Sequence, residues 1–149
     1  MNKEALLEVH NRVKPYIHRT PVLSSELINE ISGCKVYFKC ENFQKMGAFK
    51  MRGAANAISK LSDEQKNKGV VTHSSGNFAQ ALSLAAKKIG VKAYIVMPES
   101  APQVKKNAVR TYDGEIFESG STPKEREDLA EEVRIEKGAT LMYLGKTII

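Results

Sequence analysis

Short apolar runs alternate with helix-forming runs over the second half of this 149-residue chain, and this order restricts the folds open to it. Strands are predicted over residues 70–73, 91–97, 115–117 and 139–144, and helices over residues 78–89, 103–112 and 123–137. Strands that are separated by helices of this length become parallel neighbours through crossovers. The pattern predicts an α/β fold, an open parallel sheet with flanking helices, with functional loops at the carboxyl ends of its strands.

The first half of the chain is less regular. A helix is predicted up to about Lys14, a short helix over residues 25–31 and a strand over residues 36–41. Another helix follows Lys50, and the run Ser62-Asp63-Glu64-Gln65 has capping-box spacing for a short helix that ends near Gly69.

Lys50 lies where the strand-like run 35–40 gives way to an alanine-rich helix. The positive end of a helix disfavours an ammonium, and burial has the same effect. A lysine in such a place can act as an amine nucleophile and then as a base. We therefore consider Lys50 a candidate Schiff-base lysine; the alternative is a solvated surface lysine beside an aromatic residue.

A second motif, Ser74-Ser75-Gly76-Asn77, joins a β-branched strand to another alanine-rich helix. Glycine lets the backbone approach a ligand closely, while the hydroxyls, the amide and the free N–H groups of the helix start are donors for a carboxylate. By itself this sequence is also typical of ordinary helix capping. The two motifs together are more specific than either alone.

Both motifs resemble those of the fold-type II pyridoxal-phosphate enzymes, in the threonine/serine dehydratase and serine racemase group. The lysine motif of that group reads Ser-Phe-Lys-x-Arg-Gly, and this chain has Ala48-Phe49-Lys50-Met51-Arg52-Gly53. The resemblance extends from about Val9 to about Thr140 and implies pyridoxal 5'-phosphate as the cofactor. It implies that residues 1–68 begin the larger domain and carry Lys50, and that residues 69–149 form the smaller α/β domain with the substrate loop.

The resemblance also implies a role for each site residue. Lys50 would hold the cofactor as a Schiff base and then take the Cα proton of a small amino-acid substrate, threonine or serine. Phe49 would pack on the cofactor ring, and Asn77 would hydrogen-bond to the ring's 3-hydroxyl. The substrate would be bound by Ser74, Ser75, Gly76 and Asn77.

Ser75 matches a serine that acts as an acid and base on the face opposite the lysine in serine racemases. Racemisation needs a base on each face, whereas elimination needs only one. We favour a threonine/serine ammonia-lyase, which gives a 2-oxo acid and ammonia, over the alternative of a serine racemase. An alternative of another class is a catalytically silent α/β fragment or binding module.

The chain departs from the family pattern in two respects. Phe78 stands where the family often has histidine, and no two glycines are adjacent, although the family's phosphate-binding loop is a run of glycines in its later half. We expect a truncated or frameshifted member of the family. In the full-length form we expect a homo-oligomer.

The formal net charge of +6 and the pI near 9.3 raise nucleic acid as a partner. Acidic residues interrupt the basic ones and no nucleic-acid motif is present, so we expect no such partner. No apolar stretch approaches the roughly 20 residues of a membrane span, and no secretory signal is visible, so we expect no membrane contact and a cytoplasmic location. Cys34 and Cys40 are then predicted to be free thiols.

The remaining polar candidates are the histidines and Arg52. His10, His18 and His73 are not spaced as metal ligands, so no metal site is expected. His73 is predicted to be a partly buried imidazole whose hydrogen bonds are satisfied. Arg52 is predicted either to form an ion pair on a helix surface or to contact the cofactor phosphate.

Overall fold

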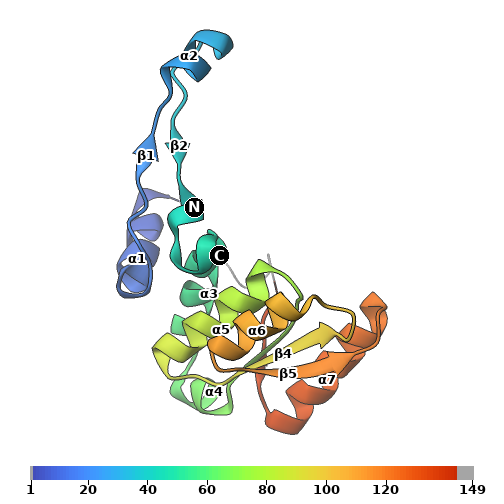
Figure 1. The fold of residues 1–149 in the computed structure, drawn as a ribbon. Helices are drawn as coiled ribbons and strands as arrows, with labels where there is room; N and C mark the ends of the chain where they lie inside the picture. Colours follow the sequence, from blue (N-terminus) through green and yellow to red (C-terminus); the bar gives the residue numbers. More distant parts are fainter. Residues whose placement is uncertain (1, 144–149) are drawn as a thin grey trace.

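The computed structural model describes residues 2–143 and has a four-stranded parallel sheet in the order β5-β4-β3-β6 (Figure 1). The strands are β3 (Val70–His73), β4 (Ala93–Pro98), β5 (Gly114–Ser119) and β6 (Thr140–Leu141). Every residue of β4 is buried, because helices cover both faces of the sheet. The predicted α/β class and parallel sheet are therefore confirmed.

Alternate residues of β4 point into two separate cores. Ile95 and Met97 join the core beneath α5 (Asn77–Ile89) and α6 (Gln103–Thr111). Tyr94 and Val96 join a smaller core beneath α7 (Pro123–Lys137). This period of two is what a strand that is buried on both faces requires.

We call residues 63–141, the four-stranded sheet and the helices around it, the sheet unit. Its helices begin and end where the sequence predicts. α4 (Asp63–Lys68) and α7 both start at complete capping boxes, from Ser62 and from Thr122. Gly90 and Gly138 end α5 and α7 with positive φ values of 82° and 63°. Glycine adopts this left-handed conformation without a Cβ clash.

Helix α3 (Lys50–Ser59) packs against α5. The two helices bring small side chains with no exposed surface to one shared core: Ala54, Ala55, Ala79, Ala81, Ala85 and Ala86. α3 therefore shares one core with the sheet unit, although it lies before residue 68. The domain boundary near residue 68 stays a prediction.

The first 49 residues carry short elements: α1 (Lys3–Val13), η1 (Lys14–Tyr16), β1 (Val22–Leu23), α2 (Glu26–Ser32), β2 (Phe38–Lys39), η2 (Glu41–Phe43) and η3 (Lys45–Gly47). Strands β1 and β2 pair antiparallel, and α2 joins them. We call residues 22–39 the arm, which extends away from the sheet unit in Figure 1. None of its three elements has a buried residue.

The strand predicted over residues 36–41 is wrong in length, since β2 has only two residues. It pairs with an equally short β1, no core lies beneath it, and a 3-10 turn starts at Glu41. The strand predicted over 139–144 is observed as β6, and position 144 lies outside the described residues. Cys34 and Cys40 are free, as predicted. None of the helices found in residues 2–143 is both long and apolar enough to span a bilayer.

Candidate active site

Lys50 is the first residue of α3, as the sequence predicts. The next residue, Met51, is fully buried and anchors this helix start in the core. Phe49, just before the helix, is 56% exposed, and the Lys50 Nζ lies 4.3 Å from the centroid of its ring. Lys50 has no hydrogen bond or ion pair with any residue between 2 and 143.

The Lys50 Nζ lies over the face of the Phe49 ring, and such a ring face attracts a cation. For Nζ to reach a ligand, the side chain must leave this ring face. An exposed Phe49 ring is then free to pack against a flat ligand.

The loop of Ser74, Ser75 and Gly76 follows the carboxyl end of β3, as predicted. The Ser74 N–H donates to the Val96 carbonyl at 3.1 Å, which continues the β3–β4 ladder by one bond. The Gly76 N–H donates to Ser74 Oγ at 3.4 Å. These two bonds fix the start of the loop.

Helix α5 begins at Asn77 without a side-chain cap, so its first N–H groups remain available to an acceptor. A Cβ added to Gly76 would meet no atom within 4 Å, so the space beside this glycine is open. Asn77 itself is exposed. A carboxylate could approach the uncapped helix start from this side, where peptide dipoles favour an anion.

His73, the last residue of β3, has a buried Nε2 atom without a hydrogen-bond partner among the residues that the structure describes. Its ring contacts Tyr143 edge-on, with 5.5 Å between the ring centroids. His73 is partly buried, as predicted, but the prediction that its hydrogen bonds are satisfied is wrong at Nε2. A buried polar atom without a hydrogen-bond partner costs free energy of folding. A ligand group that forms a hydrogen bond with this nitrogen, beside the loop, would remove that cost.

Phe78 is only 4% exposed and packs in the core that also holds Met51. Met51 follows Lys50, and Phe78 follows Asn77. The first turns of α3 and α5 are therefore anchored in the same core. Because Phe78 points into that core, it is not a ligand contact. Its burial explains why an apolar residue is tolerated at a position where the family often has histidine.

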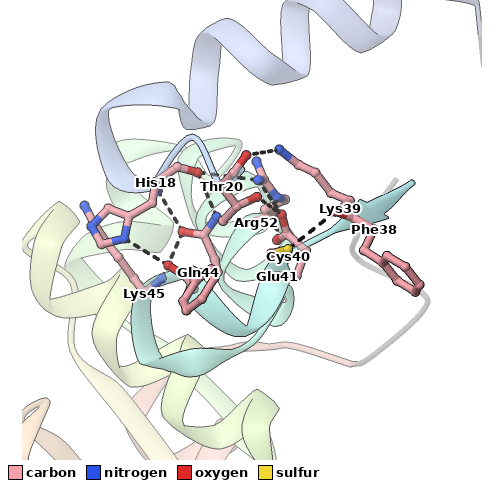
Figure 2. A network of polar contacts seen from close by, with 10 residues as sticks. His18, Thr20, Phe38, Lys39, Cys40, Glu41, Gln44, Lys45 and Arg52 are labelled. Atoms are coloured by element: carbon pink, nitrogen blue, oxygen red, sulfur yellow. Dashed lines mark hydrogen bonds and ion pairs between the residues drawn. The ribbon is translucent and has the colours of Figure 1, made fainter. Parts of the chain in front are cut away.

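Arg52 forms an ion pair with Glu41, as one of the two predictions for it required (Figure 2). The guanidinium donates from Nε to Glu41 Oε2 at 2.9 Å and from Nη2 to Oε1 at 2.7 Å. Thr20 donates its hydroxyl to the same carboxylate at 2.6 Å. These hydrogen bonds, that from Arg52 foremost, lower the pKa of Glu41 to about 2.

Gln44 adds a second part to this network (Figure 2). Its amide accepts from the His18 N–H at 2.7 Å and donates to the His18 carbonyl at 2.9 Å. No local sequence pattern indicates Glu41 and Gln44, since their partners Thr20 and His18 lie 21 and 26 residues away. Only the fold brings these polar groups together.

The family model for "Pyridoxal-phosphate dependent enzyme" matches residues 13–145 of the chain. This chain belongs to the pyridoxal-phosphate dependent enzyme family. The match spans both the Lys50 segment and the loop after β3, so the fold-type II resemblance is confirmed. The family's cofactor is the one expected from the sequence.

Among relatives in this family, the serine racemase of Arabidopsis thaliana is 55% identical over 139 residues, 93% of this chain and 42% of the relative. The beta-hydroxyaspartate dehydratase of Paracoccus denitrificans is 48% identical over 140 residues, 94% of this chain and 44% of the relative. The solved structure of maize serine racemase matches with a TM-score of 0.91 at 50% identity and covers 94% of this chain and 43% of its own. The chain thus spans less than half the length of these relatives.

The described residues fit pyridoxal 5'-phosphate at its aldehyde and ring. An amine at Lys50 without a hydrogen-bond partner among residues 2–143, and the exposed Phe49 ring beside it, suit the aldehyde and the flat ring respectively. At the loop before α5, His73 Nε2 has no hydrogen-bond partner among residues 2–143, and the space beside Gly76 is open. A glycine run for the phosphate is not in this sequence.

Proposed function

We propose that this chain carries the lysine and the substrate loop of a threonine/serine ammonia-lyase, which converts its amino acid to a 2-oxo acid and ammonia. The observation that carries the proposal is the pairing of Lys50 at the start of α3 with the uncapped loop at the start of α5, two helices that pack together. Dehydratases and threonine deaminase are among the similar proteins, at 48% and 40% identity.

In this proposal Lys50 Nζ would hold the cofactor and would also accept the proton from the substrate Cα. The cofactor, when bound, would supply the electron sink for that proton loss. Phe49 would pack on the cofactor ring, and Asn77 would donate a hydrogen bond to the ring's 3-hydroxyl. Ser74, Ser75, Gly76 and Asn77 hold the substrate carboxylate through hydroxyls and the first N–H groups of α5.

Serine racemase is the second candidate, and the 55% identity to the Arabidopsis enzyme favours it. It differs from the lyase in needing a second base on the face of the substrate opposite Lys50. Ser75 is the residue to which we assign that role. The hydroxyl makes no hydrogen bond with the other residues that the structure describes, so it is free to exchange a proton.

The test begins with the absorbance of the purified chain mixed with pyridoxal phosphate, followed by borohydride reduction and peptide mapping. We expect an absorbance band of the protein-bound cofactor, and we expect reduction to attach the cofactor to Lys50. Lys50→Ala should abolish this absorbance band. Lys60→Ala is the matched control, because Lys60 is an exposed lysine that caps the other end of the same helix. A band that survives Lys50→Ala, or equal labelling of both lysines, would contradict the assignment and favour a catalytically silent fragment.

Ser75→Ala separates the two candidate reactions in any preparation that turns over serine. Loss of racemisation with elimination retained identifies Ser75 as the second base and supports a racemase. Ammonia release with no racemisation in the unmodified chain supports the lyase. Equal loss of both reactions in Ser75→Ala would show that the substitution damages the loop, and would remove the role assigned to this hydroxyl.

A further inference from the structure

His73 ends β3 beside the substrate loop, and the function proposed above gives it no role. Residues of a strand alternate between the two faces of a sheet, and Val71, two residues earlier, packs in the core beneath α7. His73 therefore faces α7, where its ring and that of Tyr143 meet edge-on. Its Nε2 is buried without a hydrogen-bond partner among residues 2–143. A neutral imidazole has one donor and one acceptor nitrogen, so Nε2 lacks a partner in either tautomer.

This nitrogen is kept at a cost in stability. A buried polar atom without a hydrogen-bond partner destabilises the free protein. An apolar ring at position 73 would keep the contact with Tyr143, and would lie on the same face as Val71 and Val96, without that cost. Polar groups that lower stability in this way are expected at functional sites. We therefore expect the nitrogen to gain its partner in the ligand-bound protein.

The end of β3 is fastened to the segment that carries Tyr143. The Thr72 hydroxyl donates to the Met142 carbonyl at 2.7 Å, and the Met142 N–H donates to the Val71 carbonyl at 2.8 Å. These bonds hold the strand on the side where the two rings meet. The His73 ring is therefore a fixed point from which the substrate loop extends.

The hydroxyl of Ser75 is the available partner in this loop. It makes no hydrogen bond with the other residues that the structure describes, whereas Ser74 Oγ already accepts from the Gly76 N–H. The Ser74 N–H donates to the Val96 carbonyl, so the chain stays extended up to Ser74. Residues two apart in an extended chain share a side, so Ser75 follows on the side of His73.

The chemistry of a serine hydroxyl explains why such a partner is needed. A serine holds its proton too tightly to act alone as a base near neutral pH, and serines that exchange protons in enzymes have a base beside them. Imidazole is the usual partner, because it takes up and releases protons in this pH range. His73 Nε2 is an imidazole nitrogen two residues from Ser75.

We infer that His73 is the proton partner of Ser75: when the loop binds its substrate, the Ser75 hydroxyl forms a hydrogen bond with Nε2 and exchanges its proton there. This inference rests on the proposed function, in which Ser75 is the second base of the racemase candidate. It adds the residue through which that base is charged and discharged. It also gives the buried nitrogen the partner that the free protein lacks.

In the direction that starts from the substrate, the Cα–H bond breaks and Ser75 Oγ takes its proton. The proton that Oγ held passes to His73 Nε2, and the electron pair of the broken bond passes to the electron sink of the bound cofactor. In the reverse direction Nε2 returns its proton to Oγ as Oγ gives one to Cα. Nε2 accepts a proton only in the tautomer that carries its hydrogen on Nδ1. Because His73 acts through Ser75, it is a positioning residue.

The first test needs no cofactor. His73→Phe keeps a ring beside Tyr143 and removes the unpartnered nitrogen, so we expect its urea midpoint to lie above that of the unmodified chain. His10→Phe is the control at an exposed histidine of α1 and should not raise the midpoint. A lower midpoint for His73→Phe would show that Nε2 has a partner in the free protein, and would overturn the proposal.

The second test follows the histidine ring nitrogens by NMR during a titration with L-serine in the presence of pyridoxal phosphate. We expect the His73 Nε2 resonance to be that of an acceptor nitrogen and to move together with the loop amides. Ser75→Ala should abolish the movement of Nε2, while the His10 and His18 resonances stay in place. Loop amides that move without Nε2 would overturn the inference alone. If no loop amide moves, the serine site of the proposed function fails and the role of His73 fails with it.

The third test is kinetic and uses any preparation that turns over serine. His73→Phe should lower the rate of racemisation about 100-fold and that of elimination far less. His73→Gln supplies a hydrogen-bond acceptor that cannot take up a proton, so it should restore the KM for serine but not the kcat of racemisation. Recovery of kcat in His73→Gln, or unchanged racemisation in His73→Phe, would overturn the proposal. Labelling of Lys50 remains the separate test of the proposed function.

Discussion

The sheet unit and the arm belong to one chain, yet they are held by different forces. In the sheet unit, Leu82 and Ile95 have no exposed surface, and helices cover both faces of the strands. In the arm, Leu27 and Ile31 are 64% and 78% exposed. Burial of apolar surface therefore stabilises the sheet unit and contributes little to the arm.

The base of the arm depends instead on polar contacts that reach across the chain. Glu41 joins Arg52 of α3 to Thr20, and Gln44 joins the backbone of His18 to the turn at Lys45. Hydrogen bonds of this kind fix the orientation of the groups that they join, but they contribute less to the free energy of folding than a packed core does. This sequence therefore fills the cores on both faces of the sheet, whereas the base of the arm is held by polar contacts.

Leu82→Ala is expected to have the largest effect on stability. It removes a fully buried side chain from α5 and should lower the free energy of unfolding by about 2–5 kcal/mol. Leu27→Ala is the matched change in the arm and should cost less than about 0.5 kcal/mol, because that side chain is mostly exposed. Urea unfolding of both variants measures the two losses in the free energy of unfolding. Equal losses would contradict the contrast between the sheet unit and the arm.

Two glycine substitutions sharpen the contrast between packing and ligand access. In Gly114→Ala the new Cβ would lie 2.5 Å from Ser83 Oγ and 2.6 Å from Val109 Cγ1, so we expect a loss of about 1–3 kcal/mol. Gly76→Ala meets open space and should leave the urea midpoint unchanged. Under the proposed function, it should still weaken substrate binding, measured by the spectral response to added serine.

Glu41→Gln tests the polar network at the base of the arm. The pKa of Glu41 is lowered from its ordinary 4.5 to about 2, so its contribution is complete above the ordinary value and is lost as the pH falls through about 2. At pH 7 we expect Glu41→Gln to lower the free energy of unfolding by about 1–2 kcal/mol, reduced by the solvent that reaches the pair. Near the lower pKa the two proteins should unfold alike; a constant difference across pH would show that charge is not the cause.

Helix caps give the smallest expected difference. Thr122→Ala removes a capping box from α7 and should cost about 1 kcal/mol. Ser25→Ala removes the cap of α2, whose bond from the Ile28 N–H is 3.5 Å long, and should change the thermal midpoint by less. A larger shift for Ser25→Ala would mean that the arm contributes more to the cooperative unfolding unit than its burial indicates.

Local signals were sufficient for the sheet unit. Capping boxes at Ser62 and Thr122, glycine stops at Gly90 and Gly138, and apolar strands between them are each encoded within a few residues. The position of Lys50 at a helix start follows from the same kind of signal. These features were predictable because neighbouring residues in sequence determine them.

Features that depend on distant residues were not predictable in the same way. The Arg52–Glu41 pair arises only when separate elements meet, and so does the burial of His73 Nε2 without a partner among residues 2–143. Strand β2 was predicted too long because residues 36–41 have the pattern of a strand, whereas no core lies beneath β2 in the fold. The roles of Ser74, Ser75, Gly76 and Asn77 came from motif resemblance and stay proposals.

Amide hydrogen exchange, followed by mass spectrometry of peptic fragments, tests the contrast between the two regions most directly. Our account predicts that amides of β3, β4 and α5 exchange only through opening of the whole sheet unit, while those of residues 22–39 exchange orders of magnitude faster. Protection of the arm as strong as that of β4 in the isolated chain would contradict the account.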